Sequence, residues 1–329
     1  MTIFLAIFAG IGLGYILERG DFCFHSTMRG LFRQPAELDL FRAYLLTLLI
    51  AVPLVSLMRW IGWIDPWVAP FSPGANMVGG IIFGVGMVIA ATCITGLFYK
   101  LGHGMLGTMI ALITWAVGDV LAYRGPLSSL RDTLNANPLT RSGEQIALPT
   151  LLGSAAPFLL ALVGAAIAFY LWQSPRGDRQ KYWGWLPLGI ATGLFTSGAW
   201  LLARNGGSNY PYGTSSVPTQ IFDAITTDST LSVWIPLSLV TIVFGALLAS
   251  YLSGTLWVRG ETIDRYAELA TGGLLMGIGA GIAGGCNLGH SLIGVPLLSL
   301  GSIATTFSMA LGVFVAHQAK QMWAARYFE

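Results

Sequence analysis

The stretches VGGIIFGVGMVIAATCITG (residues 78–96) and TGGLLMGIGAGIAGGCNLG (residues 271–289) carry the same pattern around a cysteine. They align without a gap at an offset of 193 residues, and eight of their nineteen positions are identical. Five of these identities are glycines and one is the cysteine, Cys93 in the first stretch and Cys286 in the second. A duplicated, glycine-interrupted apolar segment with a polarisable side chain at the same place is typical of transporters whose binding site lies between two repeats.

The composition indicates a membrane protein. Of the 329 residues, 54% are hydrophobic and 10% are charged, against roughly 25% charged in soluble domains. The net charge of +2 gives no indication of a nucleic-acid partner. An apolar run of about 18 residues or more is long enough to cross the hydrocarbon as a helix. The sequence therefore predicts an all-α polytopic membrane protein with nine spans, at about 2–18, 42–60, 77–99, 104–123, 150–173, 184–203, 232–257, 270–290 and 297–317. The first lacks a basic leader and a small-residue cleavage site, so we expect it to be retained.

The position of the duplicated segment predicts the architecture. It falls in the third and eighth spans, and five crossings separate the copies, so they should run in opposite directions through the bilayer. This is the inverted-topology repeat of many secondary transporters. We expect one membrane domain over residues 1–329, with repeat halves at 1–123 and 184–329 and a linker span at 150–173. The long connections 124–149 and 204–231 are either solvated connectors or parts of a vestibule.

Lysines and arginines are distributed unevenly between the spans. Twelve of the 17 fall in the odd-numbered connections and the C-terminal tail, and five fall in the even-numbered connections. Connections rich in lysine and arginine stay in the cytoplasm. The distribution therefore predicts an N-terminus outside the cell and a C-terminus in the cytoplasm.

The three cysteines, Cys23, Cys93 and Cys286, are the candidate substrate-binding residues. The sequence contains no Cys-x-x-Cys pair and no Cys–His spacing of the kind that is typical of a metal site. We therefore expect neither metal nor cofactor. A buried free cysteine is often a small hydrophobic residue only. A thiol in apolar surroundings, however, stays neutral because its pKa rises above about 8.5. Neutral thiols do not repel an anion, so a row of them could bind a soft sulfur or selenium anion briefly and release it.

The cysteine-bearing spans contain no lysine or arginine, so the charge of such an anion must be balanced in another way. Helix N-termini present free N–H groups and a partial positive charge. Gly96 and Gly289, each three residues after a cysteine, are suited to ending a helix. We therefore expect broken or re-entrant half-helices around the cysteines, although the glycines also suit close helix packing.

Three stretches together resemble the YeeE/YedE sulfur-transport family: GLGYILERGDFCFHSTMRG (residues 12–30), GGIIFGVGMVIAATCITG (79–96) and GIAGGCNLGHSLIGVPLLSLGS (281–302). The resemblance extends over essentially the whole chain. It implies an hourglass-shaped protein of the bacterial inner membrane that takes up thiosulfate past three essential cysteines, which correspond to Cys23, Cys93 and Cys286. It also implies that S–H hydrogen bonds hand the anion along, and that a TusA-like cytoplasmic protein, here a separate chain, receives the sulfur.

Other functions stay open on the sequence alone. A selenium compound or another soft sulfur anion suits the same chemistry, because some relatives are associated with selenium metabolism. A membrane sulfurtransferase is a third possibility, but it would need a thiol activated by a nearby base or cation. We therefore expect a transporter and not an enzyme.

Several polar residues near the cysteines are candidates for secondary substrate contacts: His25, Thr95, Asn287 and His290. Alternatively, they satisfy helix ends. Asp119 lies near the end of the fourth span, where proton coupling is conceivable and an interfacial carboxylate is the simpler interpretation. The stretch LLARNGGSNYP (residues 201–211) should match the Cys23 region in the second repeat, and it has no cysteine.

Overall fold

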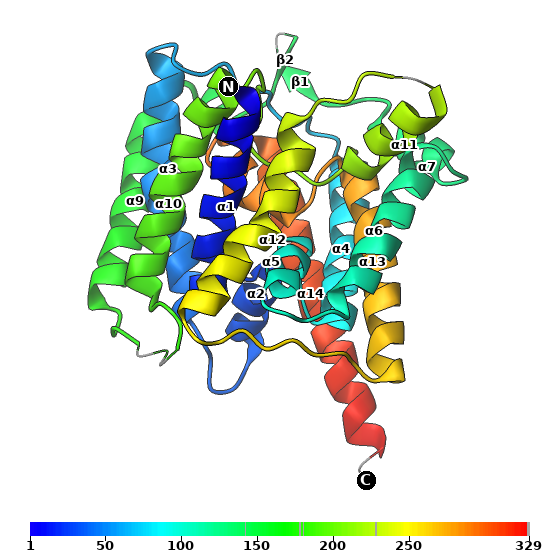
Figure 1. The fold of residues 1–329 in the computed structure, drawn as a ribbon. Coiled ribbons are helices and arrows are strands. Elements are labelled where there is room, and N and C mark those ends of the chain that lie inside the picture. The colour runs from blue at the N-terminus through cyan, green and yellow to red at the C-terminus, as the bar shows by residue number, and fades with distance from the viewer. Residues whose placement is uncertain (142, 178, 180, 228, 328–329) are drawn as a thin grey trace.

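A computed structural model describes residues 1–141, 143–177, 179, 181–227 and 229–327. Within these residues, nine helices run between the two faces of the molecule (Figure 1). Their bounds are α1 Thr2–Gly20, α3 Asp39–Trp60, α4 Pro73–Ala90, α6 Thr108–Tyr123, α9 Ala156–Gln173, α10 Trp185–Asn205, α12 Trp234–Leu252, α13 Ile263–Ala283 and α14 Leu300–Tyr327. The prediction of an all-α polytopic membrane protein is confirmed.

Eight helical segments of the described chain are long and apolar enough to cross a membrane, and α6, with 16 residues, is a ninth and shorter apolar helix. Three of the eight are composite. In Thr2–Phe32 and Pro73–Gly102 a second helix follows a break, and in Leu148–Gln173 two short helical turns precede α9. The two termini lie at opposite faces (Figure 1). We call these faces the N-terminal face and the C-terminal face.

Shorter elements fill the connections. Three follow the breaks and are central to the site: α2 Phe24–Phe32, α5 Ile94–Gly102 and the π-helix η2 Leu288–Gly294. The remainder lie toward the N-terminal face (Figure 1): α7 Ser128–Asn135, β1 Thr140–Arg141, β2 Glu144–Gln145, α8 Leu148–Leu152, η1 Gly153–Ala155 and α11 Val217–Thr227. The two strands form one antiparallel pair, with Thr140 opposite Gln145.

The duplicated glycines bring α4 and α13 together as antiparallel neighbours. A Cβ built on Gly79 would lie 2.7 Å from the carbonyl oxygen of Gly279, and one built on Gly279 would lie 2.7 Å from that of Gly79. Gly86 and Gly272 meet in the same reciprocal way, at 2.8 and 2.7 Å. Small residues allow membrane helices to pack backbone against backbone. The glycines therefore hold the two repeats together along a pseudo-two-fold axis.

The other neighbours follow the same symmetry. Gly84 on α4 packs against Gly312 of α14, and the equivalent Gly277 on α13 packs against Gly118 of α6. Likewise α1 packs on α12, while α10 packs on α3. The linker helix α9 contacts mainly α3 and leaves most of its surface exposed. The inverted-topology repeat predicted from the sequence is therefore present in the fold.

Candidate functional site

The chain breaks in the same way before each cysteine. Asp21, Ala91 and Gly284 adopt left-handed backbone conformations, with φ of 43°, 50° and 75°, and each lies two residues before a cysteine. The next N–H then donates to a carbonyl five residues back: Phe22 to Leu17, Thr92 to Met87 and Gly285 to Ala280. This is the Schellman arrangement that closes a helix C-terminus.

Gly96 and Gly289 do not end helices, so this prediction was wrong. Gly96 lies in the first turn of α5 and Gly289 lies in η2. The left-handed residue that ends α4 is Ala91, which has a Cβ and gave no signal in the sequence. The break within the predicted span 77–99 therefore comes before the cysteine and not after it.

An arginine from another element satisfies the carbonyl end of each broken helix. Arg179 donates to the oxygen of Gly20 at 2.5 Å, and Arg131 donates to that of Gly281 at 3.2 Å. Arg265 donates to the oxygens of Ile89 and Ala90. Cations are favourable at helix C-termini, where the dipole is negative. Sequence reasoning missed these arginines because each is remote from its break along the chain.

Each cysteine then starts the next helical segment. The carbonyl oxygens of Cys23, Cys93 and Cys286 accept N–H bonds from the residue four positions later, each at 2.9 Å. Cys23 and Cys93 are the N-caps of α2 and α5. All three side chains are completely buried. The prediction of broken half-helices around the cysteines is thus confirmed, but the structure starts these half-helices at the cysteines, which the sequence analysis did not predict.

The structure brings Cys23 and Cys93 into contact. The Cys23 thiol donates to Cys93 Sγ at 3.3 Å, and the backbone N–H of Cys93 donates to Cys23 Sγ at 3.3 Å. The N–H of Gly96 donates to Cys93 Sγ, also at 3.3 Å. The two sulfurs therefore lie at the N-terminus of α5, where N–H groups and the helix dipole favour negative charge.

Cys286 belongs to the opposing half-helix. Among the described residues, its thiol makes no hydrogen bond to the other two sulfurs. The connection is made by its neighbour, because the side-chain amide of Asn287 donates to Thr95 Oγ1 at 3.0 Å. Asn287 and Thr95 are both 2% exposed. The N-terminal ends of α5 and η2 therefore meet across the repeat axis.

The predicted secondary contacts surround these ends. His25 Nδ1, Asn287 Oδ1 and His290 Nε2 are buried without a hydrogen-bond partner in the described structure. The other ring nitrogen of His290 is 3.0 Å from Ser302 Oγ. Buried polar atoms normally have partners, so three orphaned atoms beside the cysteines indicate a place for a polar ligand.

A cavity of only about 10 Å³ lies among the half-helices. It is lined by Phe22, Phe24, Thr27, Tyr44, Thr95, Asn287 and Leu292. A volume of this size holds roughly one water molecule. Passage of a larger anion therefore requires these side chains to move apart.

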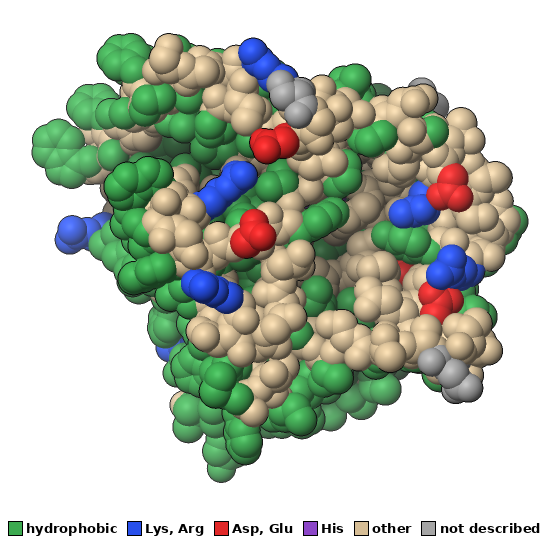
Figure 2. All heavy atoms as spheres, turned by 90° about the horizontal axis from the view of Figure 1, so that it is seen from above, with side chains coloured by type: hydrophobic (Ala, Val, Ile, Leu, Met, Phe, Trp, Pro, Cys, Tyr) green, Lys and Arg blue, Asp and Glu red, His purple; other side chains and the backbone are tan. Residues whose placement is uncertain are grey.

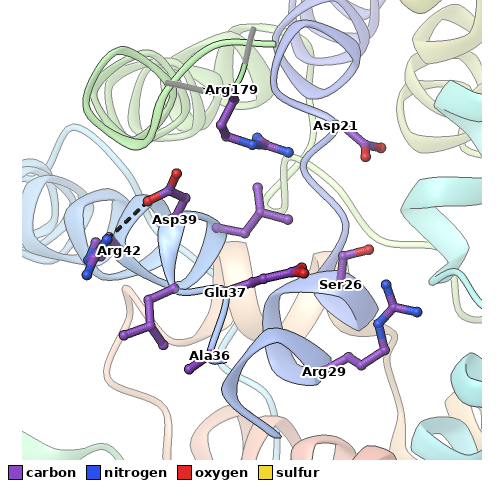
Figure 3. Close-up of a pocket in the computed structure, with 10 residues that line it drawn as sticks. Asp21, Ser26, Arg29, Ala36, Glu37, Asp39, Arg42 and Arg179 are labelled. Atoms are coloured by element: carbon purple, nitrogen blue, oxygen red, sulfur yellow. Dashed lines mark hydrogen bonds and ion pairs between the residues drawn. The ribbon is translucent and has the colours of Figure 1, made fainter. Parts of the chain in front are cut away.

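Larger cavities open at both faces. One of about 420 Å³ lies at the C-terminal face, with Asp21, Arg29 and Arg179 in its lining (Figure 3). One of about 290 Å³ at the N-terminal face includes Gly207 and Asn209. Figure 2 shows charges of both signs spread over the N-terminal face among larger hydrophobic and uncharged areas, so no field of one sign dominates it.

The second repeat contains a fourth helix break of the same kind, at the position equivalent to the break before Cys23, but no cysteine follows it. Gly207 is left-handed with φ of 78°, and Ser208 N–H donates to the oxygen of Ala203 at 2.8 Å, as Phe22 does to Leu17. Asn209 therefore occupies the position that Cys23 has in the first repeat. The expected asymmetry of the cysteines is real, and an amide replaces the thiol.

Three tyrosines near the site were also missed by the sequence analysis. Tyr210 donates to the oxygen of Gly289 at 2.7 Å, and its ring lies between two tryptophan rings with centroids 5.4 and 5.6 Å away. Tyr44 donates to the oxygen of Ser291 at 3.3 Å. Tyr99 donates to Asp21 Oδ1 at 2.8 Å. These contacts span long sequence separations, so no local pattern indicates them.

Comparison with known proteins identifies relatives of nearly the full length. The sequence profile described as "Sulphur transport" matches residues 19–315. The thiosulfate transporter TsuA of Spirochaeta thermophila is 30% identical, over 94% of this chain and 96% of the relative. The thiosulfate transporter TsuA of Escherichia coli is 27% identical, over 94% of this chain and 92% of the relative. The probable transporter YedE of Salmonella typhimurium is 32% identical, over 36% of this chain and 29% of its own length.

Proposed function

The chain belongs to the sulphur transport family, and from this premise we propose that it takes up thiosulfate across the bacterial inner membrane. The observation that carries the proposal is the meeting of two half-helix N-termini at buried thiols, with Cys23 and Cys93 Sγ 3.3 Å apart. The two TsuA relatives, which match nearly the whole chain, are named as thiosulfate transporters.

The transport path begins at the N-terminal face, which we take as the outer face because of the distribution of lysine and arginine. Thiosulfate first reaches Cys286 at the start of η2. In this proposal Asn287 Nδ2, which now donates to Thr95, and the unpartnered ring nitrogen of His290 donate to the sulfonate oxygens. The amide of Asn287 must then release Thr95, so arrival of the anion is coupled to separation of the half-helices.

The sulfur pair receives the anion next. The N–H groups of Cys93 and Gly96 point at the sulfurs, so an anion here has backbone donors and the α5 dipole to balance its charge. The thiols donate weak S–H hydrogen bonds, which hold a soft anion without trapping it. Cys23 starts α2, which leads toward the cavity at the C-terminal face, and it is the exit contact.

The proposed receiver at the cytoplasmic face is a TusA-like sulfur-handling protein. Uptake of a selenium compound or another soft sulfur anion is the second candidate. The sulfur pair of Cys23 and Cys93 favours binding of any soft anion, a selenium compound as well as thiosulfate, over a hard oxyanion such as sulfate.

Uptake of radiolabelled thiosulfate by cells that lack their own importer tests the proposal. Cells that express the chain should accumulate label, and Cys23→Ala, Cys93→Ala and Cys286→Ala should abolish it at matched expression. Ser72→Ala is a suitable control, because it removes a buried hydroxyl that has no hydrogen-bond partner. No accumulation by the well-expressed parent chain would exclude thiosulfate and leave the selenium or alternative sulfur substrate.

A further inference from the structure

The C-terminal ends of α1 and α5 are joined by two hydrogen-bonded pairs that have no part in the proposed transport path. Glu18 Oε1 is 2.6 Å from His103 Nδ1, and Asp21 Oδ1 accepts from the Tyr99 hydroxyl at 2.8 Å. Glu18 lies in the last turn of α1 and Asp21 is the C-cap of that helix, while Tyr99 lies in the last turns of α5 and His103 is its C-cap. Both pairs therefore join the C-terminal ends of α1 and α5. We call these four residues the acid ladder.

The ladder connects the cysteines with the cavity at the C-terminal face. Tyr99 is 1% exposed and lies on α5, the half-helix that begins after Cys93. At the other end, Asp21 lines the cavity of about 420 Å³ (Figure 3). A hydroxyl–carboxylate pair between buried thiols and an open cavity is a short route for a proton.

Glu18 distinguishes this cluster from other ion pairs of the protein. Among the described residues, the buried carboxylates are Glu18, 3% exposed, and Asp119, 0% exposed. Asp119 accepts three hydrogen bonds, from Ser216 N, Thr219 N and Thr219 Oγ1, so it is the cap of α11 and not a free proton site. Glu18 has a titratable histidine as its partner. An ionisable residue within a membrane helix is a candidate functional residue.

The charged and titratable groups around the ladder come from three elements. Lys100 follows Tyr99 on α5, Arg179 and Tyr182 lie in the 174–184 connection, and Arg259 lies in the 253–262 connection. Burial, and then the carboxylates of Asp21 and Glu18, raise the pKa of Tyr182. Of the other helices packed on α1, α10 contributes no charged residue at this level, and α12 contributes only the exposed Tyr251.

We propose that the acid ladder passes protons between the sulfur pair and the C-terminal-face cavity, and that entry of the sulfur dianion is thereby accompanied by protons. The proposal rests on the proposed function. An uncoupled dianion faces an inside-negative potential, and at 100 mV its equilibrium concentration inside is roughly 2,000-fold lower than outside. Each co-transported proton cancels one charge, so two make uptake independent of the potential.

Proteoliposomes containing the purified chain, a luminal pH dye and a clamped membrane potential test this. Exchange of labelled for unlabelled thiosulfate is measured first, and its absence in the parent chain contradicts the proposed function itself. Given exchange, adding thiosulfate outside should acidify the lumen. An acid-outside gradient of about one pH unit should raise the initial uptake rate severalfold, up to tenfold for each proton.

Tyr99→Phe and Glu18→Gln should lose luminal acidification and the response to the pH gradient, while thiosulfate exchange remains measurable and shows that they fold. The matched control is Tyr182→Phe, which removes a hydroxyl near the same carboxylates but outside the ladder, and it should retain both proton signals. Thiosulfate uptake by the parent chain without proton movement overturns the proposal. So does Tyr99→Phe with unchanged coupling.

Discussion

Replacing Gly96 by alanine tests the geometry of the sulfur pair. A Cβ at this position would lie 2.2 Å from Thr92 Oγ1, 3.2 Å from Cys23 Sγ and 3.6 Å from Cys93 Sγ. Thr92 must move by more than about 1 Å to reach ordinary contact, and the Cys23 sulfur must shift by a few tenths of an ångström. Overpacking of this kind costs about 1–3 kcal/mol. If that cost falls on the anion-bound state, uptake drops by roughly 5- to 150-fold.

Gly289 is the matched control because it is the equivalent glycine of the second repeat. A Cβ there would have its nearest neighbours, Gly213 Cα and Tyr212 O, at 3.8 Å, which is ordinary van der Waals contact. We expect Gly289→Ala to transport within about twofold of the parent chain. The assay is initial-rate uptake of labelled thiosulfate at matched expression, with thermal unfolding to detect misfolding. Equal rates for Gly96→Ala and the parent chain would refute the packing argument, and so would equal losses at both glycines.

Three further predictions concern the surroundings of the site. Thr95→Val removes the acceptor of the Asn287 amide, so it should slow uptake several-fold with little effect on expression; an unchanged rate would show that the half-helix contact has no role in transport. Asp119→Asn weakens the three bonds that cap α11 and should cost about 1–3 kcal/mol, seen as a lower melting temperature with uptake retained; an unchanged melting temperature would contradict this. The hydrogen bond from Arg124 lowers the pKa of the part-buried Asp223, so the pair stabilises the fold above the ordinary Asp value of about 3.9, and this stabilisation is lost as the pH falls through the lowered native pKa. Asp223→Asn should therefore melt slightly below the parent chain at about pH 7, and the difference should shrink as the pH is lowered below the ordinary Asp value; a difference that grows on acidification would reverse this assignment.

The architecture could be predicted because the residues that reveal the repeat in the sequence, the duplicated glycines, are also the residues at which the two repeats pack together. The duplicated glycines indicated antiparallel repeats, and they contact one another in the reciprocal pairs Gly79–Gly279 and Gly86–Gly272. The segments that become spans are marked by apolar length alone. Even so, the break in the 77–99 span was expected at Gly96 and not at Ala91, because apolar character does not change at Ala91, where the helix ends.

The candidate site could be predicted only in part. The cysteine contexts identified the three thiols, and the helix N-termini around them followed from the need to balance an anion's charge. The contact between Cys23 and Cys93 joins residues 70 positions apart, and the arginine that satisfies Gly20 comes from a connection 159 residues away. Such pairings depend on how the repeats pack, which no local pattern encodes. The sequence showed only that the second repeat has no cysteine equivalent to Cys23. Asn209 could be assigned to that position only from the backbone, because the helix break at Gly207 matches the break at Asp21.

The central claim is that the anion touches the thiols, and alkylation of the cysteines tests it most directly. The purified chain is treated with a small membrane-permeant maleimide, and modification of Cys23, Cys93 and Cys286 is followed by mass spectrometry with thiosulfate, with sulfate or with neither. The account predicts that thiosulfate slows modification of all three cysteines and that sulfate, which lacks the soft terminal sulfur, has little effect. Equal rates of modification in all three conditions, from a chain that exchanges thiosulfate, would contradict a path lined by the thiols.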